Sequence, residues 1–354
     1  MKKFLALILA LCMVFALAAC GQAAAPAAAP AQEAAPAQEA APAEEAAPVE
    51  ASGLIECDDM TWKYTCSCGD QTAWADFGRQ FGAYVNERTT GNFAVDVYPQ
   101  DQLVNGVQTE GIQGVIDGTI EISGHSNLIY SNFDQRLNVV SLPFIFDDYD
   151  EVDAILDGPG YDALAPIVED LGLHLLGIGE NGFRDITNSR QPFEKLEDLK
   201  GLKIRVAGAS ILNSTFEALG TNWSNANWSE VYTGLQTGTY EGQENPLTTA
   251  YASSISDVQK YCTLWTGVYD CVFFCVNQDL YDSLSPEMQA LVDEAGAYCA
   301  NQQRRVGREG DAEKGYLSLG EVVDAWTAAG MTISELSDDA VAELKEATSG
   351  VAAE

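Results

Sequence analysis

The chain has 354 residues, with 53 acidic and 18 basic side chains and a formal net charge of −35. This balance argues against nucleic acid as a partner, since phosphate binding needs a basic face. The same charge favours a monomer because like-charged copies repel each other. A hydrophobic content of 47% is enough for one large core or two smaller ones.

The first twenty residues have the features of an export signal. Two lysines precede an apolar run over 4–17, which is too short for a comfortable membrane span. The run ends in Leu-Ala-Ala-Cys, which resembles a bacterial lipobox, so we expect cleavage before Cys20 and lipidation of Cys20. An ordinary secretory signal is the alternative. With a lipidated Cys20 the mature protein is anchored to a membrane surface and does not span the membrane.

Residues 21–52 repeat Ala-Ala-Pro with interspersed Gln and Glu. This segment has no aromatic residues for a core, and its prolines interrupt helices. We therefore predict a disordered tether. The folded part then covers roughly 300 residues, a length that suggests two lobes.

The first half of the folded part alternates strands and helices. Period-two runs predict strands over 61–67, 93–98, 119–123 and 173–178. Apolar residues at helical spacing predict helices over 74–85, 107–116, 149–156 and 161–171. This βαβα order favours an α/β domain with a largely parallel sheet.

The pattern restarts after Gly182. We expect strands over 202–206, 221–224 and 272–278, helices over 210–219 and 230–236, and a helix that begins at Ser285-Pro286 and continues to Trp326. We assign 56–181 with 271–310 to lobe I, and 182–270 with 311–354 to lobe II.

Enzyme motifs are scarce. The stretch GIGENG, 177–182, matches a dinucleotide fingerprint formally, but no amphipathic helix follows it. We interpret it as a turn between lobes. The Walker, His-Glu-x-x-His and Gly-x-Ser-x-Gly patterns are missing from the sequence, and only His125 and His174 could act as imidazole bases. We expect His174 to be a core or edge residue, and we expect neither catalysis nor a cofactor.

The cysteines after Cys20 leave two interpretations open. An exported protein can keep disulfides, but seven cysteines leave at least one unpaired. No paired Cys-x-x-Cys motif indicates a metal site. We expect buried thiols, with or without one disulfide.

The positive evidence is the placement of a few cations. Lys203 and Arg205 alternate with apolar residues on one strand, and Arg184 lies among asparagines and glycines. A guanidinium offers a fixed fork of donors that suits a carboxylate. Two arginines in a cleft would attract an anion in spite of the global charge. A salt bridge to one of the many carboxylates is the alternative for each.

The order and spacing of six segments resemble a known family. The chain resembles a DctP-type solute-binding protein of tripartite ATP-independent periplasmic (TRAP) transporters. The resemblance implies a two-lobe, periplasmic-binding-protein-like α/β fold, with hinge strands and a long helix crossing both lobes. The similar segments are YPQDQL (98–103), GVIDGTIEIS (114–123), SLPFIFDDYDEVDAIL (141–156), NGFRDITNSRQPFEKLEDLKGLKIRV (181–206), WSEVYTGLQTGTYEGQENPL (228–247) and LSPEMQALVDEA (284–295).

The resemblance also implies site residues. Arg205 would grip the ligand carboxylate, Arg184 would be a second anion contact, and Asn245 would orient the same carboxylate. Trp228 would pack on the ligand body, and Trp223 and Tyr232 suggest an aromatic-rich pocket. From the first lobe, the residues expected to face the cleft are Ser67, Asn105, His125, Ser126 and Asn127.

The family implies an extracytoplasmic binding protein that captures an organic acid. It would deliver the acid to TRAP membrane subunits for uptake driven by an ion gradient. Three alternatives are a binding protein for an ATP-driven importer, a ligand-sensing module, and an extracytoplasmic carboxylate-processing enzyme.

Overall fold

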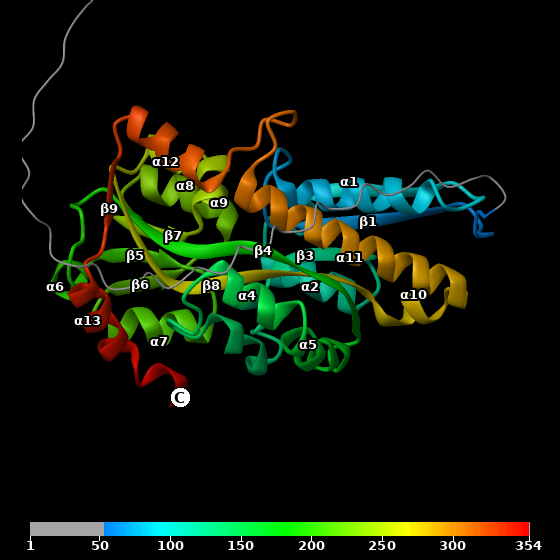
Figure 1. Ribbon diagram of the computed structural model, residues 1–354, viewed down its shortest axis with the longest axis horizontal. Helices are drawn as coiled ribbons and strands as arrows, with labels where there is room; N and C mark the ends of the chain where they lie inside the picture. Colours follow the sequence, from blue (N-terminus) through cyan, green and yellow to red (C-terminus); the bar gives the residue numbers. More distant parts are fainter. Residues whose placement is uncertain (1–52, 354) are drawn as a thin grey trace, which may run out of the picture. The chain divides into compact units, whose positions relative to one another are not determined.

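The computed structural model describes residues 53–353, and its strands form one mixed sheet (Figure 1). The strand order is β2-β1-β3-β8-β4-β7-β5-β6, and β9 pairs with β8. The strands are β1 Met60–Cys66, β2 Phe93–Pro99, β3 Ile122–Ser126, β4 Leu173–Asn188, β5 Lys203–Val206, β6 Asn222–Asn225, β7 Gly242–Asn245, β8 Tyr261–Asn277 and β9 Thr332–Glu335.

Two long antiparallel strands, β4 and β8, connect the two ends of this sheet. The end of β8 pairs with β3 on one side and with the start of β4 on the other, whereas the end of β4 pairs with β7. On either side the outer strands are parallel: β1 with β2 and β3, and β5 with β6 and β7. The sheet is therefore mixed, and the expectation of a largely parallel one was wrong at its centre.

Helices cover both faces of the sheet. In Figure 1, α9 and α12 lie above β4, β5 and β7, and α4, α5 and α7 lie below the strands. The helices are α1 Ala73–Asn86, α2 Gln108–Ile116, α3 Asn127–Tyr130, α4 Tyr149–Leu156, α5 Pro159–Glu169, α6 Leu196–Leu199, α7 Ser210–Ala218, α8 Trp228–Gln236, α9 Leu247–Ala252, α10 Gln278–Asp282, α11 Pro286–Glu309, α12 Leu319–Ala328 and α13 Asp338–Thr348.

The long helix α11 packs on β4 and on α1. Ser285 caps its first turn by accepting a hydrogen bond from the Met288 amide, as the Ser-Pro start predicts. A Cβ at Gly296 would lie 2.6 Å from the Leu176 carbonyl oxygen, so this glycine lets the helix approach the strand closely. The helix ends before Gly310 and α12 is separate, so the continuous helix expected to Trp326 was wrong.

Residues 177–182 are not a turn. They lie inside β4, whose sixteen residues continue through the glycines. Strand β3 is also displaced from the predicted 119–123 to Ile122–Ser126. The lobe boundaries remain a prediction.

Several expectations concern the ends and the cysteines. The export signal, Cys20 and the tether lie outside the described residues. Within 53–353 no helix is both long and apolar enough to cross a membrane. The seven cysteines of this part are free thiols, and six of them are buried.

Candidate functional site

The carboxyl ends of several strands meet at one pocket, as ligand sites of open α/β sheets do. The pocket has about 340 Å³ of empty space, open solvent at its mouth included, beside the middle of β4 and β8. Its lining residues come from both sides of these long strands: Ser67, Cys68, Trp74, Gln108, Ser126, Ile129, Asn181, Arg184, Arg205, Ala207, Trp228, Asn245, Thr249 and Asp270.

An irregularity in β4 brings two of these side chains to the pocket. Asn181 and Arg184 are three residues apart, so regular alternation would place them on opposite faces. The pairing with β8 shifts between Glu180 and Gly182, and Gly182 has φ +116°, which suits glycine. Such a shift redirects side chains next to functional sites.

Arg184 is buried, and its guanidinium is bound by the protein's own carboxylates. Nε and Nη1 form ion pairs with Glu244 and Asp270, and Nη2 donates to Glu244 Oε1 and to the Glu244 carbonyl oxygen, each at 2.9 Å. Burial lowers the pKa of Arg184, but the two carboxylates outweigh this effect and raise it. All three nitrogens therefore have partners.

Asp270 joins Arg184 to side chains from other elements. Its carboxylate accepts hydrogen bonds from Ser126 Oγ at 2.6 Å and from Asn181 Nδ2 at 2.7 Å. Asn181 Oδ1 in turn accepts from Thr249 Oγ1 at 2.5 Å. Burial raises the pKa of Asp270, and the positive charge of Arg184 opposes that rise.

Arg205 is equally buried but has no carboxylate partner within the described part of the chain. Its Nε and Nη2 donate to the Ala226 carbonyl oxygen at 3.0 and 2.5 Å. The guanidinium carbon lies 5.7 Å from the centre of the Trp228 ring. Burial lowers the pKa of Arg205 to about 10, so the group stays charged at neutral pH.

The two arginines and the carboxylates of Glu244 and Asp270 together have a formal charge of zero. Because the carboxylates bind Arg184, the charge of Arg205 is available to an anion. Its Nη1 and the second hydrogen of Nη2 are not used by Ala226, and together they form the fork that fits a carboxylate.

The comparisons with known proteins agree with this fold. The model of the family described as "Bacterial extracellular solute-binding protein, family 7" matches residues 67–354. The chain belongs to this family. The 2,3-diketo-L-gulonate-binding periplasmic protein YiaO of Escherichia coli is 33% identical over 257 residues, which are 72% of this chain and 75% of YiaO.

Solved structures of similar proteins have the same fold. A TRAP periplasmic solute-binding protein from Ralstonia eutropha H16, with bound (S)-2-acetolactate, is 31% identical with a TM-score of 0.76, and the match covers 82% of this chain and 92% of that one. The sugar acid binding protein DctPAm from Advenella mimigardefordensis, in complex with galactonate, is 27% identical with a TM-score of 0.77 and coverages of 84% and 92%. The predicted family and two-lobe α/β fold are confirmed.

Six of the residues predicted from the family pattern line the pocket: Arg205, Arg184, Asn245, Trp228, Ser67 and Ser126. Asn245 comes from the end of β7, and its Nδ2 donates to Gln243 Oε1 at 3.0 Å. Ser67 follows β1 and accepts a hydrogen bond from Gln108 Nε2 at 2.9 Å.

Three predicted residues do not line this family 7 pocket. Asn105 is exposed at the end of a short 3-10 turn. His125 is buried on the other face of β3, with Nε2 2.8 Å from Asp101 Oδ1. Asn127 donates to the Leu137 carbonyl oxygen and to Ser141 Oγ inside the fold. We do not include these three in the proposed site.

Other pocket residues were not predicted. Trp74 and Thr249 lie in the first turns of α1 and α9, just after β1 and β7. The carboxyl-end rule for strands could have indicated both. Asp270 lies inside a run that resembles any buried strand, and nothing local in the sequence distinguishes it. Trp223 and Tyr232 do not line the pocket.

Proposed function

We propose that Arg205 binds the carboxylate of an organic acid, and that this binding is the function of the pocket. The observation that supports it best is a buried guanidinium without a carboxylate partner among residues 53–353. Leaving a buried charge unpaired costs several kcal/mol, roughly, unless a ligand compensates it. The named ligands of similar proteins, acetolactate and galactonate, are carboxylates.

The site serves capture and release of an acid. Serine, asparagine and glutamine side chains surround the guanidinium and can bond to ligand oxygens. We propose that the protein acts outside the cytoplasm as a monomer, held by lipid on Cys20, and that it transfers its ligand unchanged to TRAP membrane subunits. Membrane fractionation of a Cys20→Ser variant tests the anchor, because release into the soluble fraction is the expected result.

Calorimetric titration of Arg205→Lys tests the proposed contact. A thermal-shift screen of organic acids first identifies a ligand, since a molecule that binds only the folded state raises its apparent stability. Lysine keeps the charge but is a point donor without a fork. Losing a buried charged contact costs about 2–5 kcal/mol, or roughly thirtyfold to several-thousandfold in affinity.

Lys203→Ala is the matched control. Lys203 is exposed on the same strand, two residues before Arg205, and its replacement should leave affinity within about threefold. Near-native affinity of Arg205→Lys, or equal losses at both positions, would contradict the proposed role of Arg205.

A further inference from the structure

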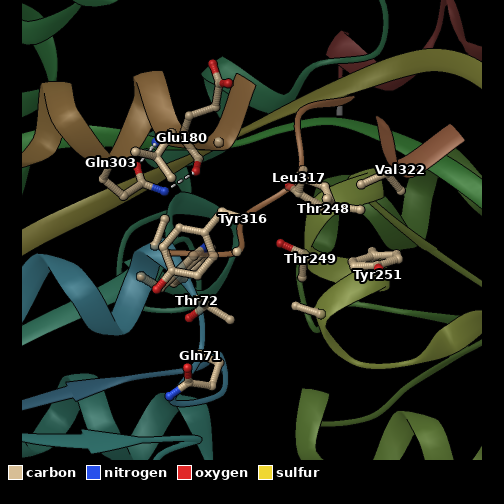
Figure 2. A pocket seen from close by; sticks show the side chains of 16 residues that line it. Gln71, Thr72, Glu180, Thr248, Thr249, Tyr251, Gln303, Tyr316, Leu317 and Val322 are labelled. Atoms are coloured by element: carbon tan, nitrogen blue, oxygen red, sulfur yellow. Dashed lines mark hydrogen bonds between the residues drawn. The ribbon is translucent and has the colours of Figure 1, made fainter. Parts of the chain in front are cut away.

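A second pocket adjoins the first and is larger. Figure 2 shows the side chains that line this second pocket. Its empty space is about 640 Å³, open solvent at its mouth included, against about 340 Å³ for the pocket of Arg205. Trp74 and Thr249 line both pockets. The other walls come from residues 71–73 at the start of α1, from Glu180 in β4, and from α9, α11, α12 and the connection between α11 and α12.

The surface of this second pocket is mostly apolar. Figure 2 shows Tyr251, Tyr316, Leu317 and Val322 around the space, and Val306 adds a further apolar side chain. Gln71, Thr72 and Thr248 are polar side chains of the same lining. No arginine or lysine lines it in the part of the chain that the structure describes. An anionic group would find no compensating charge there.

The polar groups on the α11 side are already bonded. Gln303 accepts from the Glu180 amide at 2.8 Å and donates to the Glu180 carbonyl oxygen at 2.7 Å. The Glu180 carboxylate accepts from Arg308 Nη2 at 2.6 Å and from the Tyr269 hydroxyl at 3.0 Å. These groups therefore have little capacity left for a chain of ligand hydroxyls.

The first pocket offers one guanidinium to a ligand. Arg184 is ion-paired with both Glu244 and Asp270, so Arg205 is the one cation without a carboxylate in contact among the lining residues that the structure describes. A second ligand carboxylate would meet Asp270 without a cation of its own. Like charges at short range disfavour such a ligand.

We propose that the ligand is a monocarboxylic acid whose uncharged, largely apolar body extends past Trp74 and Thr249 into the second pocket. This inference rests on the proposed role of Arg205 as the carboxylate site. It sets the ligand apart from dicarboxylates and from polyhydroxylated acids such as the galactonate of one similar protein.

Titration of the wild-type protein with acetate, butanoate, hexanoate and octanoate tests the apolar body. Each methylene that enters the second pocket should raise affinity up to about fourfold. Succinate and galactonate serve as the charged and polyhydroxylated comparisons and should bind more weakly than hexanoate. Tighter binding of either, or no gain with chain length, would overturn the inference.

Filling the second pocket supplies a separate test. Gly307 lies in α11 and lines this pocket, and a Cβ there meets nothing within 4 Å. Gly307→Leu should therefore fold and occupy the space, lowering octanoate affinity about tenfold or more while acetate stays within about threefold. Gly320→Leu is the control, since Gly320 is also helical and free of neighbours within 4 Å but lines neither pocket.

The results separate the two proposals. If Arg205→Lys abolishes binding but chain length and Gly307→Leu have no effect, Arg205 keeps its role and the apolar extension is wrong. If alkanoates gain affinity with length and Arg205→Lys binds them normally, the carboxylate contact itself is wrong. Loss of the octanoate gain in Gly307→Leu, with Gly320→Leu unchanged, supports the second pocket as the site of the ligand body.

Discussion

Arg184 on β4 and Arg205 on β5 line the same pocket, and their exposed fractions are 2% and 1%. They differ in their partners. Arg184 is bound by two carboxylates from distant parts of the chain, whereas among residues 53–353 Arg205 forms hydrogen bonds only to the Ala226 carbonyl oxygen. Burial of a cation is therefore not enough to indicate a ligand contact; the neighbouring charges decide whether it stabilises the fold or binds an anion.

The largest effect expected from this difference is on stability. Arg184→Leu leaves Glu244 and Asp270 buried without their cation, and we expect a loss of about 3–5 kcal/mol. Arg205→Leu removes a charge that contacts no carboxylate among residues 53–353, so its cost should stay below about 2 kcal/mol, mainly for the unpaired Ala226 carbonyl.

Urea unfolding, monitored by circular dichroism, measures the loss of stability in both variants. Comparable destabilisation by the two variants would remove the distinction between a structural and a ligand-binding arginine. A stable Arg184→Leu protein would show that Glu244 and Asp270 accept a proton or water at little cost.

The sequence contains part of this information. Strand alternation and the family pattern identify Arg205, and the helix start at Ser285-Pro286 and the bounds of α4 follow from local signals. The partners of Arg184 cannot be identified from local signals, because Glu244 and Asp270 lie 60 and 86 residues away in an acid-rich chain. Any of 53 acidic side chains could have taken those positions.

The length of β4 could not be predicted from its local sequence either. Glycines weaken a strand, so 177–182 resembles a turn. In the fold these glycines allow close packing, since a Cβ would lie 2.8 Å from Ala300 Cβ at Gly177 and 2.6 Å from a Phe274 ring carbon at Gly179. The strand β3 likewise extends further than predicted and includes His125 and Ser126. Because side chains alternate along a strand, Ser126 lines the pocket and His125 lies on the opposite face.

Asp185 is an acidic residue that is buried in the same way as Arg205. It follows Arg184 on β4 and is buried, and its Oδ1 accepts from the amides of Trp265 and Thr266 at 3.1 and 3.3 Å. Burial raises its pKa from 3.8 to about 7, while these hydrogen bonds lower it. Like Arg205, Asp185 is a buried group without an oppositely charged side chain in contact among residues 53–353.

Asp185→Asn should remove a loss of stability that the wild type suffers as pH rises. Between pH 4 and 7 the folded state keeps a proton that the unfolded state releases, so Asp185 destabilises the wild type as pH rises. Relative to wild type, the variant should gain up to about 4 kcal/mol above pH 8 and almost nothing at pH 4. Urea unfolding of both proteins at pH 4, 6 and 8 measures this gain; parallel pH profiles would show that Asp185 does not hold the proton.

The smallest expected effect concerns the ring beside Arg205. Trp228 lies 5.7 Å from the guanidinium carbon, and indole attracts a cation more strongly than benzene does. Trp228→Phe keeps an aromatic ring but weakens this attraction by about 0.5–1 kcal/mol, so ligand affinity should fall about two- to fivefold. Trp223→Phe is the matched control, because Trp223 is half-buried on β6 and does not line the pocket. Titration of both variants measures the difference: an equal loss in each would indicate a general effect on packing, and no loss in Trp228→Phe would mean that Ala226 alone orients the guanidinium.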